Sequence, residues 1–271
     1  MTSLRELLAS FETLWPASGA EDWDAPGLVV GNGASEITRV LLTVDVTADV
    51  IEEAAGKYDL VLAHHPFLLR GIKQASEGSA KGFVLAKAIR NNLAIFAAHT
   101  NADIVSAGVS ETLAGALGIK DLSPLVSTSN PVVGHGRIGT LSEPLLLGDF
   151  ARTVARILPP TATGVRVAGA YTQTVQKIAV CGGAGDSFIT AAFDAGADVY
   201  LTADLRHHVV QDARESALLT DLPLAIIDVS HWASEWLWLD VAASQLRQLH
   251  TDVTFDVCEL RTDPFDFVIT Q

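Results

Sequence analysis

Hydrophobic segments of strand length alternate along this chain with segments that have helical spacing. In the first half the expected strands are 37–46, 59–63 and 93–99, and the expected helices are 48–58 and 81–92. In the second half the expected strands are 177–183, 197–203 and 222–231, and the expected helices are 186–196 and 207–219. Strands that alternate with helices in this way predict an α/β protein with mixed sheets flanked by helices.

The two halves also resemble each other in sequence. DLVLAHH aligns with DVYLTAD, and NLAIFAAHTNAD aligns with LPLAIIDVSHWASE. His99 then corresponds to His231, and each of them closes an apolar strand. We therefore predict two related α/β domains produced by duplication; the alternative is chance similarity between buried strands of similar composition.

The chain between the halves has the composition of a linker. SPLVSTSNP at 123–131 is rich in Ser, Pro and Asn, which predicts an N-terminal domain of residues 1–125 and a C-terminal domain of residues 126–271. A strand pair and a helix at 148–158 are expected after it. The alternating segment 252–260 is typical of an edge strand, which can pack back on the first domain.

Residues with metal-binding chemistry gather where three of the apolar strands end. They are His64 and His65, His99 and Asp103, and His231 and Glu235. Ligands of open α/β sheets bind beyond the carboxyl ends of the strands, so these side chains are expected at the functional edge. Each cluster alone is explained by packing, by an Asx turn or by helix capping. Their combination predicts a metal site with N and O ligands.

The local geometry of two clusters supports this prediction. Consecutive strand residues point to opposite faces, so His64 and His65 can serve one site only if the strand ends there, which Pro66 favours. Ser230 is the predicted N-cap of a helix on which His231 and Glu235 are four residues apart and share one face. That spacing gives two ligands from one helix, as helical His pairs do for zinc.

Composition narrows the class of protein. The formal charge of −14, from 18 basic and 32 acidic residues, argues against binding of duplex nucleic acid, although an acidic balance is also explained by solubility alone. A small phosphorylated ligand stays possible, its charge met by metal ions and by a few local cations: Arg70, Lys73, Arg137 and Arg206.

The same composition bears on location. We predict a soluble, cytoplasmic protein with no membrane partner, because no apolar run approaches the roughly 18 residues of a membrane span and residues 1–14 form an amphipathic helix without features of a secretion signal. The only cysteines, Cys181 and Cys258, are too few for a thiolate zinc site or a disulfide framework.

Taken in order, AHHPF, HTNAD, GRIG, VCGGAGDS, GADVYLTADLRHH and SHWASE resemble the Nif-three-like family, whose members are labelled GTP cyclohydrolase 1 type 2 homologues. The resemblance implies two α/β domains, a dinuclear metal centre in the cleft between them and a toroidal homohexamer. Carried over residue by residue, it implies these ligands: His64, His65, Asp103, His231 and Glu235. His99 would lie beside them, supporting a ligand or carrying protons.

The chain departs from the family pattern at three places. WDAPGL stands at 23–28 where the family has WDNVGL, and the missing Asn leaves the polar role of that turn open. Asp204 follows Thr202 and Ala203 where the family often has TGE, so no catalytic role is assigned to it. The chain is also too short for the middle domain of longer members.

Three His and two carboxylates suit two ions of Zn, Fe, Mn or Co. A water activated by the metals could attack a nucleotide or a related phosphorylated small molecule, with His99 or His208 carrying protons. Attack on C8 of GTP and attack on phosphorus are not separated by the sequence. CGGAGDS is either an anion cradle or a plain turn from strand to helix. The alternatives to a hydrolase are a non-catalytic metal-binding regulatory or scaffold protein and a simple binding module.

Overall fold

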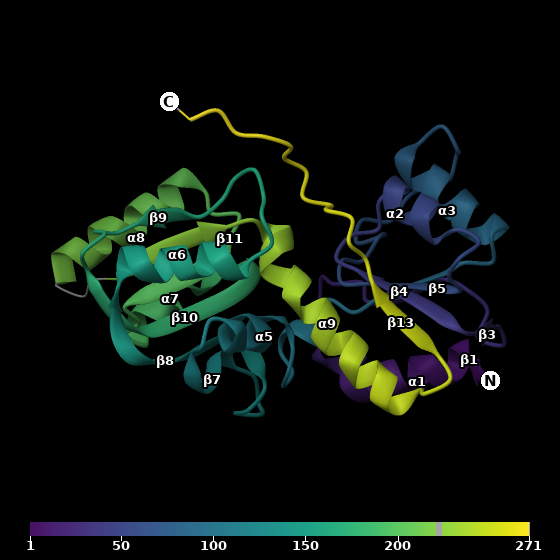
Figure 1. Ribbon diagram of the computed structural model, residues 1–271, viewed down its shortest axis with the longest axis horizontal. Coiled ribbons are helices and arrows are strands. Elements are labelled where there is room, and N and C mark those ends of the chain that lie inside the picture. Colours follow the sequence, from purple (N-terminus) through teal and green to yellow (C-terminus); the bar gives the residue numbers. More distant parts are fainter. Residues whose placement is uncertain (221–223, 271) are drawn as a thin grey trace. The chain divides into compact units, whose positions relative to one another are not determined.

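A five-stranded sheet with the strand order β13-β4-β5-β6-β2 forms the centre of the first unit of the computed structural model (Figure 1). The structure describes residues 1–220 and 224–270, and this unit comprises Met1–Val105 and Leu239–Thr262. Its elements are β1 (Thr2–Ser3), α1 (Leu4–Leu14), η1 (Ala17–Gly19), β2 (Gly27–Val30), β3 (Glu36–Ile37), β4 (Arg39–Thr43), α2 (Ala48–Ala54), β5 (Leu60–Ala63), α3 (Ala80–Arg90), β6 (Ala94–Ala97), α4 (Thr100–Asp103) and β13 (Thr254–Val257).

Parallel pairing explains the composition of the central strands. β13, β4, β5 and β6 run parallel, whereas β2 pairs antiparallel with β6. Strands of a parallel sheet are covered on both faces, so they require continuous apolar runs, and all four residues of β5 are buried. Helices α2 and α3 pack on one face, where Ile51 and Val84 join Val61 and Ile95 in a single core. The predicted terminal strand lies in this sheet, beside β4.

The second unit, Ser106–Trp238 and Asp263–Gln271, is built on a six-stranded sheet with the order β7-β8-β10-β11-β12-β9. Its elements are α5 (Val109–Ala116), β7 (Lys120–Ser127), β8 (Gly134–Leu146), α6 (Leu147–Ile157), β9 (Arg166–Ala168), β10 (Thr174–Ala184), η2 (Asp186–Phe188), α7 (Ile189–Asp194), β11 (Val199–Ala203), α8 (His207–Thr220) and β12 (Ala225–Val229). β10, β11 and β12 are parallel, and the remaining pairs are antiparallel. The predicted strand 222–231 begins at residues outside the described part of the chain and appears as β12. The α/β class with mixed sheets and flanking helices is confirmed.

Two expectations for the middle of the chain differ from the structure. The segment predicted as a linker contains β7, which pairs with β8. Pro124 fits there because β7 is an edge strand, where an amide that cannot donate to the ladder is tolerated. The division into units accordingly falls at Val105/Ser106 and not at 125/126. The expected strand pair before α6 is one strand, β8, with an irregular register.

Helix α9 spans His231–Leu249, and Ser230 is its N-cap, as the sequence predicts. The Ser230 hydroxyl accepts a hydrogen bond from the Ala233 amide at 3.3 Å and donates one to the buried Asp263 carboxylate. Residues of this helix up to Trp238 belong to the second unit, and those from Leu239 belong to the first. Among the described helices, none combines the length and the hydropathy that crossing a membrane requires.

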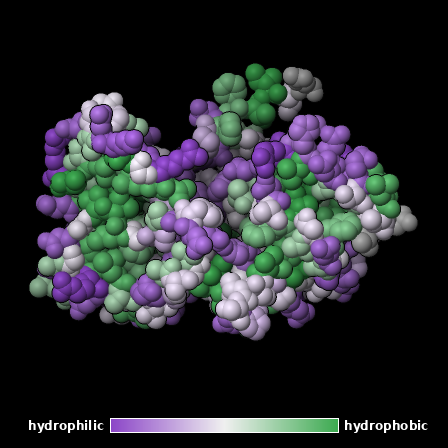
Figure 2. Space-filling model, turned by 180° about the vertical axis from the view of Figure 1, so that it is seen from behind, coloured by the Kyte–Doolittle hydropathy of each residue, from purple (hydrophilic) through white to green (hydrophobic). Residues whose placement is uncertain are grey.

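The segment after Asp263 carries exposed hydrophobic side chains. Phe265, Phe267, Val268 and Ile269 are between 59% and 79% exposed. Figure 2 shows hydrophobic atoms of this segment at the top of the view. Exposure of several large apolar groups along one short segment is unusual for a surface that stays in water.

Candidate metal centre

Three imidazoles gather at the carboxyl ends of β5 and β6 in the first unit. The ring centroids of His64 and His65 are 5.1 Å apart, and the His99 ring lies 5.3 Å from the first and 5.5 Å from the second. The amides of His64 and His65 still pair with the carbonyls of Thr43 and Val44. Both rings nevertheless lie close to His99, as a shared site requires.

Each of these imidazoles is held at Nδ1 by an oxygen. Nδ1 of His64 lies 2.9 Å from the carbonyl oxygen of Ala98. Nδ1 of His65 lies 2.7 Å from Asp45 Oδ1, and Nδ1 of His99 lies 2.7 Å from Asp24 Oδ1. Carbonyl and carboxylate oxygens accept, so Nδ1 is the donor in each pair. This leaves Nε2 as the nitrogen that offers a lone pair, which is how metal-binding histidines are usually supported.

Asp24, the aspartate that holds His99, has a pKa far from its ordinary value. Its side chain is fully buried and accepts hydrogen bonds from His99, from the Thr100 hydroxyl and amide, and from the Ala25 amide. Burial acts to raise the pKa of this carboxyl, but the hydrogen bonds from His99 and Thr100 outweigh it and lower the pKa to about 2. Asp24 therefore stays ionised and holds the His99 ring in one orientation. The turn at 23–28, whose polar role the sequence left open, supplies this contact.

Asp103 brings a carboxylate to the same cluster. It lies at the end of α4, four residues after His99, and its Oδ1 is 3.6 Å from Nε2 of the buried His64. Within HTNAD, the side-chain oxygen of Asn101 accepts a hydrogen bond from the His99 amide at 2.9 Å. The first unit thus places His64, His65, His99 and Asp103 together.

The second unit presents a matching pair on α9. Nε2 of His231 lies 3.0 Å from Oε1 of the buried Glu235, one helical turn away, and Nδ1 lies 2.7 Å from Asp204 Oδ2. Burial lowers the pKa of His231, but the Glu235 carboxylate and the hydrogen bond to Asp204 outweigh it and raise the pKa well above its ordinary value. Ligation by His231 therefore requires loss of the proton at Nε2, which makes metal binding here sensitive to pH.

Gly183, in the CGGAGDS segment, lies against this pair. Its φ is +70°, and a Cβ at this position would stand 2.4 Å from Glu235 Oε1 and 3.1 Å from His231 Nε2. Its amide donates to the Ser234 hydroxyl at 2.9 Å. The segment leads into a short 3-10 turn and the six-residue helix α7, and the glycine at 183 is explained by its close approach to Glu235.

The two ligand sets repeat each other. His99 and His231 each follow a parallel strand, each is bonded at Nδ1 to an aspartate, and each is followed four residues later by a carboxylate. Asp24, Asp45 and Asp204, which position the rings, were absent from the predicted site. Asp204 occupies the left-handed region at φ 59°, which directs its side chain from the end of β11 toward His231.

Other residues singled out in the sequence lie elsewhere. His208 is on α8, where its ring packs edge-on against His207 at 5.1 Å. Two of the cations proposed to meet a phosphate are committed to carboxylates: Arg137 is buried and paired with Glu111 at 3.0 Å, and Arg206 pairs with Asp186 at 2.6 Å.

The donor set fits a transition metal ion. The ligand nitrogens of His64, His65 and His99 lie within 4.8 Å of one another. Two nitrogens bound to one zinc ion span at most roughly 4 Å, so small shifts would suffice. Imidazole with carboxylate favours the later transition metals over Ca or Mg.

The fold and these residues together define a class of protein: an α/β protein of two units, each of which presents at least one histidine and a carboxylate beyond the ends of parallel strands. Within this class the chain belongs to the Duf34/NIF3 (NGG1p interacting factor 3) family, whose sequence model matches residues 2–264. The resemblance stated from the motifs is thereby confirmed.

Relatives match over nearly the whole chain. The GTP cyclohydrolase 1 type 2 homolog of Streptomyces coelicolor is 42% identical, with 98% of this chain and 94% of that protein covered. The homolog of Mycobacterium leprae is 29% identical over an alignment of 371 residues that covers 97% of this chain, so that protein contains additional residues. The crystal structure of a Bacillus cereus protein related to NIF3 superimposes with a TM-score of 0.91 at 26% identity, covering 98% of this chain and 99% of that one.

Proposed function

We propose that this protein is a metal-dependent hydrolase in which the ligands of both units serve one dinuclear centre. The observation that carries the proposal is the repeated arrangement of a histidine held at Nδ1 by an aspartate and followed four residues later by a carboxylate. A ring fixed in this way presents Nε2 in one direction, which a metal ligand such as His231 and a proton carrier such as His99 both require. The proposed ligands are His64, His65, Asp103, His231 and Glu235, and the proposed ions are two of Zn, Fe, Mn or Co.

When bound, the two ions would supply Lewis-acid activation of water and of the substrate. The protein residues do the rest. Asp45 and Asp204 hold the rings of His65 and His231 in their ligating orientation. His99, whose Nδ1 is held by Asp24, presents Nε2 to carry a proton to or from the reacting group.

The proposed substrate is a nucleotide or a related phosphorylated small molecule. The name of the relatives, GTP cyclohydrolase 1 type 2 homolog, supports a nucleotide. Metal ions held at the carboxyl ends of parallel strands would also attract the phosphate group of such a ligand. We further propose a cytoplasmic location, supported by two buried thiols that form no disulfide, and assembly into a homohexamer, supported by the exposed hydrophobic segment after Asp263.

A second candidate function is that of a metal-binding regulatory or scaffold protein without turnover. The family description, which names an interacting factor, favours it. The donor set opposes it, because five ligands shared by two ions leave coordination positions open that a purely structural site closes.

Turnover separates the two functions. Protein loaded with Zn, Mn, Fe or Co is incubated with GTP and with generic phosphoesters, beside a His99→Gln variant, a His65→Ala variant and the surface control Arg206→Gln. We expect metal-dependent turnover that falls at least about a hundredfold without His65 and tenfold or more without His99. Turnover that survives in the His65→Ala variant points to a contaminant, and metal-loaded protein that turns over none of these compounds favours the scaffold.

A further inference from the structure

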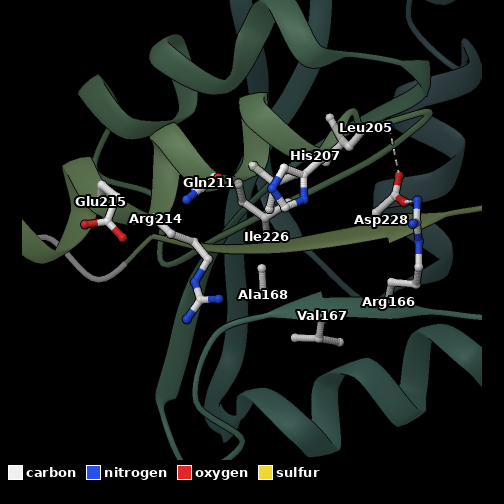
Figure 3. A pocket seen from close by; sticks show the side chains of 11 residues that line it. Arg166, Val167, Ala168, Leu205, His207, Gln211, Arg214, Glu215, Ile226 and Asp228 are labelled. Carbon is white, nitrogen blue, oxygen red and sulfur yellow. Dashed lines mark hydrogen bonds and ion pairs between the residues drawn. The ribbon is translucent and has the colours of Figure 1, made fainter. Parts of the chain in front are cut away.

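A pocket of about 510 Å³ lies within the second unit between α8 and the strands β9 and β12. Its floor is apolar, made by Ala168 and Ile226, which are paired across β9 and β12, and by Leu205. Polar side chains stand on one side. Figure 3 shows His207, Gln211 and Arg214 projecting from α8 over this floor. A volume of this size with an apolar base and a few convergent polar groups suits a small organic molecule.

Helix α8 packs loosely on the rest of its unit, which leaves space for a ligand. None of its 14 residues is buried, whereas the eight-residue helix α5 of the same unit buries four. A second cavity, of about 460 Å³, lies along its other flank. Protein interiors are normally packed to the density of organic crystals, so a helix with space on both flanks is incompletely packed.

Arg214 makes the pocket selective for charge. Among the described residues its guanidinium has neither a hydrogen bond nor an ion pair, although the chain carries 32 acidic and 18 basic residues. In contrast, Arg166 at the other end of the pocket is paired with the buried Asp228. Glu215 also lines the pocket, beyond Arg214 in Figure 3. Its carboxylate would repel an anion, and, unlike Asp228, it has no ion pair with a cation among the described residues.

We propose that this pocket is a second ligand site, which binds a small organic anion by placing its apolar body on Ala168 and Ile226 and its carboxylate or phosphate on Arg214. His207 and Gln211, which also line the pocket, would supply further hydrogen bonds. The site is separate from the proposed hydrolase chemistry and needs no metal. A chain of contacts connects the pocket with the proposed ligand His231. Asp228, which lines the pocket, accepts from the amide of Leu205 at 3.2 Å, and the preceding residue, Asp204, lies 2.7 Å from Nδ1 of His231.

Binding of phenyl phosphate, benzoate and phenol to the full-length metal-loaded protein tests the proposal. Calorimetry should show saturable binding of the two anions at one per chain, with phenol at least tenfold weaker. The Arg214→Gln variant loses a charge-assisted contact, so its affinity for phenyl phosphate should be roughly ten- to hundredfold lower. Glu215→Gln should raise the affinity for phenyl phosphate. Arg206→Gln, which replaces an arginine outside the pocket in the same way, should leave this affinity unchanged. Gln211→Trp, at an exposed position of the same helix, should fill the cavity and abolish binding.

The metal ions themselves are the competing site for these anions. An Asp103→Ala, Glu235→Ala double variant must therefore retain the binding that Arg214→Gln loses, and this outcome is independent of whether the protein is a hydrolase. The proposal is overturned if the double variant loses the binding while Arg214→Gln keeps it, if phenol binds as tightly as the anions, or if none of the probes saturates. Thermal melting of each variant confirms that the fold is intact.

Discussion

The oxygen that each imidazole meets at Nδ1 decides what the histidine can do. A ring whose Nδ1 donates to a fixed carboxylate offers Nε2 and cannot rotate away from that direction. His65, His99 and His231 are all held in this manner, by Asp45, by Asp24 and by Asp204. These aspartates are therefore as much part of the proposed centre as the residues that would touch an ion.

The low pKa of Asp24 leads to a prediction about stability. A carboxyl whose folded pKa is about 2, against about 3.9 in an unfolded chain, stabilises the fold above pH 4, and this contribution is lost as the pH falls toward 2. Asp24→Asn should therefore lower the free energy of unfolding by about 2 kcal/mol at pH 7, and the difference from the unaltered protein should shrink below pH 4. Urea denaturation at several pH values measures both.

The neighbouring Asp22→Asn serves as the control, because Asp22 is exposed. It should change the free energy of unfolding by less than about 0.5 kcal/mol at every pH. A difference for Asp24→Asn that is the same at pH 7 and at pH 3 would show that the stabilisation does not come from the ionised carboxyl.

At the scale of elements, the sequence predicted where the strands end, but it did not predict the aspartates that hold the histidine rings at those ends. Apolar runs that stop at histidines located the ends of β5 and β6, and the i,i+4 spacing of His231 and Glu235 followed from a recognisable N-cap. Asp24 lies 75 residues before His99 in a turn, and no periodicity relates the two positions. Asp45 follows the strand-like segment LLTV and could have been found by the same criterion as the histidines.

The middle of the chain shows why composition alone misplaces a boundary. Ser, Thr and Pro at 123–131 are typical of a linker, but an edge strand needs hydrogen bonds on one side only and accepts the same residues. This segment forms a strand because β8 is available as its pairing partner. A partner strand is a tertiary property, so the local sequence does not contain it.

The end of β10 leads to a prediction about the ligands of the second unit. Gly183→Ala should cost about 1 kcal/mol for its left-handed backbone, and its Cβ should also displace the Glu235 carboxylate that a Cβ would meet at 2.4 Å. We expect zinc affinity, measured by competition with a chelating dye, to fall at least about tenfold.

Gly196→Ala is the matched control, since its φ is +65° and a Cβ there meets no atom within 4 Å. It should lose a similar amount of stability and keep its zinc affinity. Equal affinities for the two variants would mean that Glu235 does not bind the metal or that its carboxylate moves aside freely.

At the scale of the whole molecule, the hydrophobic segment after Asp263 predicts assembly. Phe265, Phe267 and Ile269 occupy alternate positions of this segment and are each more than half exposed. Replacing all three with Ser should convert the assembly of the unaltered protein into smaller species, as measured by light scattering after size exclusion. Ile89→Ser, at a position 61% exposed on α3, should leave the mass unchanged. Unaltered protein that is monomeric at micromolar concentration would contradict this role.

The central claim is that ligands from both units hold two metal ions, and metal analysis of purified protein tests it most directly. The unaltered protein should contain about two transition-metal ions per chain, and the Asp103→Ala, Glu235→Ala double variant should contain far fewer. The control variant Asp49→Ala, Glu52→Ala, which removes two exposed carboxylates of α2, should match the unaltered protein. A folded double variant that keeps the full metal content would contradict the ligand assignment.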